Sequence, residues 1–391
     1  MRPLLKPIAA VLALSLVMPA YAASHTGKAA SSKNTGSCYS KAQSTNEKNI
    51  AGNPTAQGAK GCWLDRISMN GDATIIVDRA SPFNGDSSTF LQVQHLALGL
   101  DAVLASNVNA HVGLVYKSDN TSDLAGSLLD GGDTDASFDL DEAYFTWSDA
   151  AKSPLFAKVG KSFSSFGSYS NAYPVVTGMN QALVQANFTT AEVGFASNFG
   201  VDGSMFLFED TTTSDWDKYG FRAGYKGAFQ DVKYAVKLSY VSDYSAYSAG
   251  GTTLSSTDTV ATANAKESAM NLDVNAEMKN VELGASYFAV AGDLDSATSK
   301  TRPKVMSFNG KYKMNAMGYH SNIHASLEKA SDSGNVLGGS LAGTVKRLAS
   351  IGFGMKLAAN TVVGFDVFKT TNFAATNNDQ TQYIMNASVR F

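Results

Sequence analysis

The chain has 391 residues, of which 17% are charged and 10% aromatic, and its formal net charge is −3. Charged residues are scarcer than the roughly 25% of ordinary soluble domains, and the near-neutral balance excludes the basic footprint of a nucleic-acid-binding protein. After residue 22 no apolar run reaches the roughly 20 residues of a transmembrane helix, and the mean hydropathy is −0.11. Membrane residence would therefore require a closed β-barrel, since only helices and closed barrels satisfy every backbone group in lipid.

The N-terminus has the features of an export signal. Arg2 and Lys6 precede an apolar stretch over residues 8–18, and Ala20-Tyr21-Ala22 offers the small-x-small pattern of signal peptidase sites. Because the apolar stretch is too short to span a bilayer as a helix, it argues against a retained anchor. We expect residues 1–22 to be a cleaved signal peptide.

Residues 23–66 are predicted to form a flexible periplasmic leader. The segment is rich in Ser, Lys, Asn and Gly and has no sustained apolar period. Its two cysteines, Cys38 and Cys62, can form a disulfide in the oxidising periplasm, and two free thiols are the alternative. Neither cysteine begins the mature chain, so acylation as a lipoprotein is not expected.

From Ile67 the sequence changes to period-two alternation, which is typical of strands with unlike faces. We predict an all-β fold over residues 67–391, a transmembrane antiparallel up-and-down β-barrel. Tyr219, Tyr240, Tyr287 and Tyr383 stand at strand ends and suit interfacial aromatic girdles. Alternation is clearest at 67–77, 219–226, 232–240, 270–277, 281–289, 350–357 and 383–391.

The last segment ends the chain on Phe391. A final amphipathic strand with a terminal Phe resembles the signal that the barrel-assembly machinery of the outer membrane recognises. An ordinary C-terminal edge strand that happens to end in Phe is the alternative.

Connection lengths give an independent test, because such barrels have short periplasmic turns and long external loops. Long and short connections alternate, which predicts sixteen strands and places both termini in the periplasm. A stretch at 182–189 could be an extra strand, but the even strand number assigns it to a loop. The long connections are expected at 79–89, 118–136, 164–190, 209–218, 243–268, 292–304, 330–347 and 370–382, and the short ones at 105–108, 149–155, 197–201, 228–231, 278–280, 313–319 and 358–361.

No motif indicates catalysis, a cofactor or a metal site. Gly160-Lys161-Ser162 resembles the end of a phosphate-binding loop, but Leu155 replaces the required first Gly and the segment reads as a strand. His320 and His324 mimic a helical metal pair, yet four residues of a strand span about 13 Å. The acidic run 130–135 could hold calcium through its oxygens or be a solvated loop.

The polar faces of the predicted strands should line a lumen, and sixteen strands leave room for an aqueous channel. Like charges on neighbouring strands repel, so a basic face makes sense if it meets water and anionic solutes. The alternative is that these charges only hydrate the wall. The predicted pore-lining residues are Arg222, Lys226, Lys233, Lys237 and Lys356, with Asp273, Glu277 and Glu282 presenting the opposite charge.

Loop 164–190 is a second candidate feature. It is long, aromatic and uncharged, with Phe166, Gly167, Tyr169 and Pro174 as its distinctive residues. Folding inward as a constriction and packing across the barrel rim are both compatible with this composition.

Three segments resemble the LbtU-type siderophore porins. They are Asp139-Leu140-Asp141-Glu142-Ala143-Tyr144-Phe145-Thr146, then Phe156-Ala157-Lys158-Val159-Gly160-Lys161, then Ser165-Phe166-Gly167-Ser168-Tyr169. The resemblance is clearest over 138–210. It implies a sixteen-stranded outer-membrane porin linked to ferric siderophore uptake without a plug. Ser165 stands where the family has Pro, and the leader lacks the heptad pattern expected there.

The expected function is therefore a non-enzymatic outer-membrane channel for small polar solutes, with ferric siderophores or other anionic chelates as candidates. A general diffusion porin is one alternative, and a surface adhesin or structural barrel that acts through its loops is another. The expected partners are outer-membrane lipid, lipopolysaccharide, the assembly machinery through Phe391, and the solute. The oligomeric state is left open.

Overall fold

The computed structural model describes residues 66–81, 88–117, 137–149, 152–167, 178–210, 214–249, 267–292, 294–295, 300–331, 345–372 and 379–391. They form a closed antiparallel barrel of sixteen strands, as predicted. The barrel strands are β1 (Ile67–Ser81), β2 (Ser88–Ala105), β3 (Val108–Lys117), β4 (Ser137–Ser148), β5 (Leu155–Phe163), β6 (Asn187–Ala196), β7 (Val201–Phe208), β8 (Lys218–Phe229), β9 (Val232–Val241), β10 (Ala269–Met278), β11 (Val281–Val290), β14 (Lys304–Ala316), β15 (Tyr319–Ser331), β16 (Val345–Ala358), β17 (Thr361–Asn372) and β18 (Asp379–Arg390).

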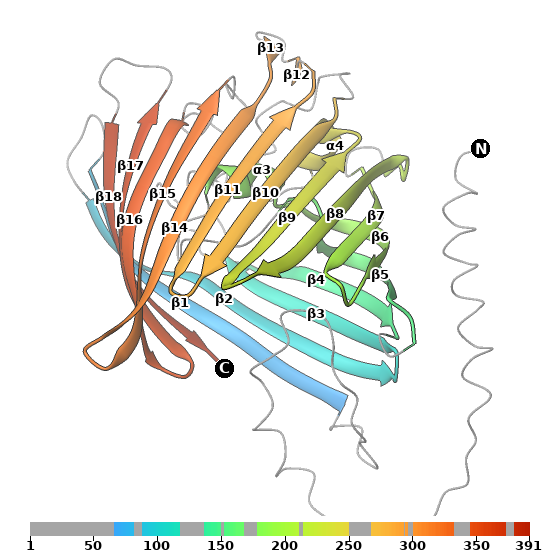
Figure 1. Cartoon of the computed structure of the whole chain (residues 1–391), viewed down its shortest axis with the longest axis horizontal. Coiled ribbons are helices and arrows are strands. Elements are labelled where there is room, and N and C mark those ends of the chain that lie inside the picture. Colours follow the sequence, from blue (N-terminus) through green and yellow to red (C-terminus); the bar gives the residue numbers. More distant parts are fainter. Residues whose placement is uncertain are drawn as a thin grey trace, which may run out of the picture. The chain divides into compact units, whose positions relative to one another are not determined.

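Each barrel strand pairs with its neighbours in the chain, and β1 pairs with β18 to close the ring (Figure 1). Between β11 and β14 the chain forms a separate two-stranded hairpin, β12 (Leu294–Asp295) and β13 (Lys300–Thr301). At the closure, the Gly71 N–H donates to the Phe391 carbonyl at 2.8 Å, and the Phe391 N–H donates to the Gly71 carbonyl at 2.9 Å. The terminal Phe391 is thus paired into the sheet.

The predicted alternation of connections is confirmed, so the barrel has a short-turn end and a long-loop end. The start of β1 and the end of β18 both lie at the short-turn end. Several predicted boundaries were wrong. β1 and β2 extend into the predicted loop 79–89, β6 begins within 164–190, and β15 and β16 extend into 330–347. The β14–β15 turn is confined to Met317 and Gly318 rather than 313–319, and β17 and β18 extend into the predicted loop 370–382. The 182–189 stretch is no strand of its own, because α3 (Met179–Val184) precedes β6 there.

Outward-facing side chains are apolar and aromatic, as the alternation predicts. Tyr219, Tyr240, Tyr287 and Tyr383 all lie on the outer face at the long-loop end. The Tyr240 ring stacks on Phe221 with 5.0 Å between centroids. Tyr225 and Tyr234 form a corresponding pair at the short-turn end, 5.8 Å apart.

Inward-facing side chains change character along the barrel axis. Towards the short-turn end they are largely charged or small. Towards the long-loop end they join a buried apolar cluster, which includes Ile76, Leu348, Phe368 and Ile384 on one side of the ring and Phe206, Phe208, Phe288 and Val305 on the other.

Among the described residues, no helix is long and apolar enough to cross a membrane. The predicted signal peptide, the leader with Cys38 and Cys62, the acidic run 130–135, Tyr169 and Pro174 all lie outside the described residues, and they remain predictions.

Candidate functional site

The basic residues predicted for the lumen face it together. Arg222 and Lys226 alternate with the outward aromatic residues of β8, and Lys233 and Lys237 alternate with those of β9. In the β8–β9 register, Arg222 lies opposite Ser239 and Lys237 lies opposite Gly224. Period-two geometry therefore places these four cations on one face.

The strands on either side of this hairpin place carboxylates next to the four cations. Arg222 forms an ion pair of 3.0 Å with Asp202 on β7, a residue that the sequence reasoning missed. On the other side, β10 places Asp273 opposite Lys237 and Glu277 opposite Lys233. Acidic strands thus flank the basic hairpin.

Two further lysines that were not predicted pair with Glu277 on β10 and Glu282 on β11. Lys313 on β14 lies 2.9 Å from Glu277 and also pairs with Glu282, while Lys311 lies 3.2 Å from Glu282. Both lysines alternate with Gly310, Tyr312 and Met314. The same period-two signal would have identified them.

Several lumen cations remain without an acidic partner. Within the described part of the chain, Lys226, Lys233, Lys237 and Lys356 form no ion pair. Of the acidic residues on β7, β10 and β11, Asp202, Glu277 and Glu282 form ion pairs and Asp273, opposite Lys237, forms none with a described residue. Lys226, Lys233 and Lys356 are also solvent-exposed. The arc from β8 to β16 therefore presents excess positive charge to the lumen.

The described residues between β5 and β6, 164–167 and 178–186, contact the inner face of the barrel. The two ends of this segment are held together, because the Ser164 N–H donates to the Ala186 carbonyl at 3.1 Å. Next to this contact, the Gly167 N–H donates to the Ser239 hydroxyl on β9 at 2.8 Å. The ring of Phe166 packs against that of Phe288 on β11, with 6.2 Å between the ring centroids. Phe166 and Gly167 thus contact lumen-facing residues of other strands.

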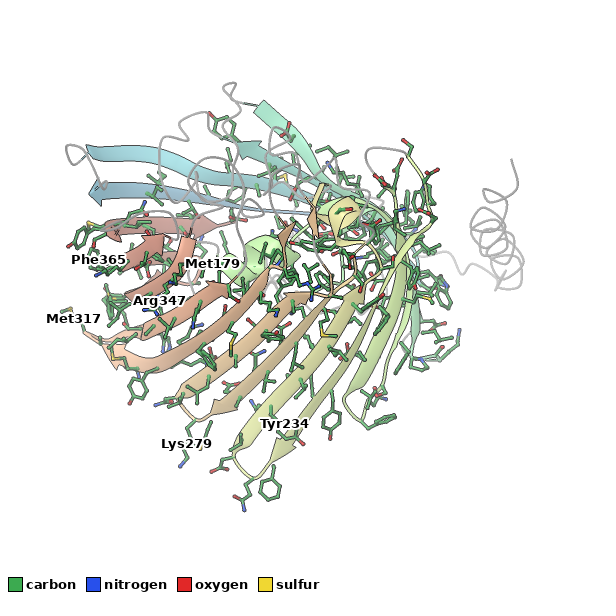
Figure 2. The ribbon with its side chains drawn as sticks, turned by 90° about the horizontal axis from the view of Figure 1, so that it is seen from above. Met179, Tyr234, Lys279, Met317, Arg347 and Phe365 are labelled. Carbon is green, nitrogen blue, oxygen red and sulfur yellow. The ribbon has the colours of Figure 1, made fainter. Side chains whose placement is uncertain are left out.

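The helix α3 of this segment rests against the far wall (Figure 2 shows Met179 inside the ring of strands). Its N-cap residue, Gly178, supplies no side-chain cap. The carboxylate of Glu328 on β15 instead accepts from the Asn180 N–H at 3.3 Å. The Asn180 side chain donates to Ser286 on β11 at 2.8 Å. Free helical N–H groups need such acceptors, so the wall itself caps the helix.

A second short helix, α4 (Tyr244–Ala249), clamps the other end of α3. The Tyr244 hydroxyl donates to the Leu183 carbonyl at 3.0 Å, and the Tyr247 hydroxyl donates to the Val184 carbonyl. The Ser164 hydroxyl lies 2.5 Å from that of Tyr247. Burial raises the pKa of the Tyr244 phenol above its ordinary value, so it stays protonated as the donor.

On the opposite wall, the segments that carry the family resemblance have a structural role. Tyr144 on β4 pairs across the sheet with Gly160 on β5, whose φ is +131°. A side chain at Gly160 would collide with the backbone of β4, which explains the Gly. Nearby, Lys158 pairs with Glu192 on β6 at 3.1 Å.

The two histidines lie in different surroundings. His320 is exposed near the β14–β15 turn, whereas His324 is buried and its Nε2 lies 2.5 Å from Asp366 on β17. In the described ranges no three His, Cys, Asp or Glu side chains group as metal ligands do.

The sequence matches no family model and no curated protein. Solved structures with the same fold include OprB of Pseudomonas putida, at 11% identity and a TM-score of 0.61, which covers 84% of this chain and 95% of that one. The outer membrane channel DcaP of Acinetobacter baumannii has 11% identity and a TM-score of 0.54, covering 83% and 97%. An anion-selective porin from Comamonas acidovorans has 11% identity and a TM-score of 0.52, covering 83% and 99%. The chain shares the sixteen-stranded barrel fold of outer-membrane porins.

Proposed function

We propose that the protein is an outer-membrane channel that passes small polar solutes and favours anions. The observation that carries the proposal is the excess of unpaired lysines on the lumen arc from β8 to β16. Fixed charges that line a water-filled pore select ions by sign. The proposal also places the short-turn end, with both barrel termini, in the periplasm.

The inserted segment supports a selective channel rather than a wide one. It places α3 inside the ring, fastened to β11 and β15 by hydrogen bonds. A solute that crosses the barrel has to pass this segment before or after it meets the basic arc. The solved relatives agree with a channel function, since two of them are named as a channel and as an anion-selective porin.

Ferric siderophores and other anionic chelates are the solutes that the family resemblance suggests. The basic arc would attract such a chelate through its net negative charge. A general diffusion porin would have the same barrel but little preference between anions of similar size.

An adhesin or structural barrel is the competing function, and the packed apolar cluster at the long-loop end favours it. Reconstitution of the purified mature protein in a planar bilayer distinguishes the two. A channel gives discrete current steps, and a closed structural barrel gives none. Addition of a ferric siderophore to one chamber should then reduce the current if the chelate enters the pore, whereas the iron-free ligand at equal charge serves as the control.

A further inference from the structure

The outer face of the barrel carries a basic row at the long-loop end of four consecutive strands. The residues are Lys304 on β14, Lys329 on β15, Arg347 on β16 and Lys369 on β17. Each lies an even number of positions along its strand from an outward-facing apolar residue, and so it faces outward too. These apolar residues are Met306, Leu327, Ile351 and Phe365 respectively. The row therefore lies just beyond the apolar band.

The spacing of these cations is close. Lys329 and Arg347 are direct cross-strand partners, and directly opposed side chains have Cβ atoms about 4.5–5.5 Å apart. Lys304 and Lys369 lie diagonally next to them, because Lys304 pairs with Ser331 and Lys369 with Ala349. Diagonal neighbours are roughly 7–8 Å apart.

Three cations of this row lack a described counter-charge, whereas Lys369 has a partner of its own and is not counted among them. Lys304, Lys329 and Arg347 form no ion pair with any described residue, and Lys329 and Arg347 are exposed. Like charges directly opposite each other destabilise a sheet. At the same level, the outer face of β8 to β11 presents Tyr219, Tyr240, Met270 and Tyr287 instead of charges. The row thus distinguishes the outer face of β14 to β17 from that of β8 to β11.

We propose that this row, the outer basic row, binds the phosphorylated sugar headgroup of a membrane glycolipid, the chemistry of lipopolysaccharide. The proposal rests on the barrel lying in the outer membrane with its long-loop end outward. A phosphomonoester carries about −1.5 to −2 charges and three acceptor oxygens, so one or two of them match several cations within about 8 Å. A phosphodiester lipid with a single charge matches them less well.

The test measures binding of lipopolysaccharide to the purified barrel in neutral detergent, for example by native mass spectrometry. Each basic residue near an anionic lipid surface strengthens binding roughly fivefold. The double variant K329Q/R347Q should therefore bind lipopolysaccharide about 30-fold more weakly. The matched control K152Q/K279Q removes two exposed lysines from short turns and should bind normally.

The single variant Lys329→Gln separates a binding role from a purely structural one. It removes one of two opposed like charges, so the lipid-free barrel should unfold at the same or a higher temperature while lipopolysaccharide binding falls. A parallel fall in stability and binding would overturn the proposal. So would unchanged binding by K329Q/R347Q, or equal binding of phosphatidylglycerol and lipopolysaccharide. Full competition by inorganic phosphate at millimolar concentration would assign the site to free phosphate and overturn the lipid assignment. None of these outcomes depends on whether the barrel conducts.

Discussion

The carboxylate of Glu328 on β15 accepts a hydrogen bond from the Asn180 backbone N–H at 3.3 Å, although 148 residues separate the two positions. This contact attaches the start of α3 to a strand on the far side of the lumen. Glu328 is buried, and its acceptor replaces the side-chain cap that Gly178 does not provide.

Replacing Glu328 by Ala should release α3 from the wall. The Asn180 N–H then loses its acceptor, which costs about 1–3 kcal/mol for a buried group, and the segment becomes more mobile. Single-channel recordings should show a noisier current and an altered mean conductance. Glu328→Gln retains an acceptor oxygen and should behave more like the wild type.

Two further variants test this attachment. In Gly178→Ala, the new methyl group would stand too close to the Glu328 carboxylate, so it should reproduce the Glu328→Ala recordings. Glu209→Ala, at the long-loop end, forms no described side-chain contact with α3 and should change nothing. Quiet, wild-type recordings from Glu328→Ala would show that the contact does not hold the segment.

The hydrogen bond from Tyr244 of α4 to the Leu183 carbonyl of α3 should be lost in alkali. The pKa of Tyr244 is raised by burial, so the protonated phenol is favoured in the folded state. Its stabilising contribution is complete below the unfolded pKa, near 10, and is lost as the pH rises above that value. Denaturant unfolding between pH 8 and 11 should therefore show a steeper loss of stability for the wild type than for Tyr244→Phe. Equal slopes would contradict this role.

The buried pair of His324 and Asp366 leaves no room for a side chain at position 352 of the strand between them, β16. Gly352 on β16 lies beneath it, and a Cβ there would collide with both side chains. We expect Gly352→Ala and Asp366→Ala each to destabilise the barrel by about 1–3 kcal/mol, because the buried His324 side chain is displaced from its acceptor or loses it. Thermal unfolding measures this loss. His320→Gln, at an exposed lumen position, is the control and should leave the unfolding temperature unchanged.

Sidedness can be tested on intact cells. An epitope inserted within 256–262, between β9 and β10, should be reached by antibody because it belongs to the long-loop end. An epitope inserted within 25–35 should be reached only after the outer membrane is permeabilised. The reverse labelling would contradict the proposed orientation.

Strand number and order were predictable because apolar residues recur at every second position wherever one face of a strand lies in apolar surroundings. The ends of β17 and β18 were missed for the same reason. Thr370 and Thr371 on β17 and Gln380 and Gln382 on β18 are polar at consecutive or alternate positions, so no apolar period marks their pairing. Hydrogen-bonded strands can continue where both faces are polar, and the periodicity then gives no signal.

The candidate site was predictable only within single hairpins. The period of two predicts that the cations of β8 and β9 share the lumen face: Arg222, Lys226, Lys233 and Lys237. The ion pair between Arg222 and Asp202 depends instead on the β7–β8 register. The contact between Asn180 and Glu328 depends on where a long connection folds. No local pattern encodes that choice, since the inward and rim placements bury similar aromatic residues.

The central claim is that unpaired lumen lysines make the channel prefer anions, and reversal potentials across a salt gradient test it most directly. The triple variant K226Q/K233Q/K237Q removes three cations without ion-pair partners, whereas D202N/R222Q removes one ion pair and no net charge. Charges in the lumen are screened over about 10 Å at 0.1 M salt, so the difference should be largest in dilute salt. The account predicts that the triple variant loses anion preference, that the paired control keeps it, and that both barrels remain folded. A wild-type channel without anion preference, or a triple variant with an unchanged reversal potential, would contradict it.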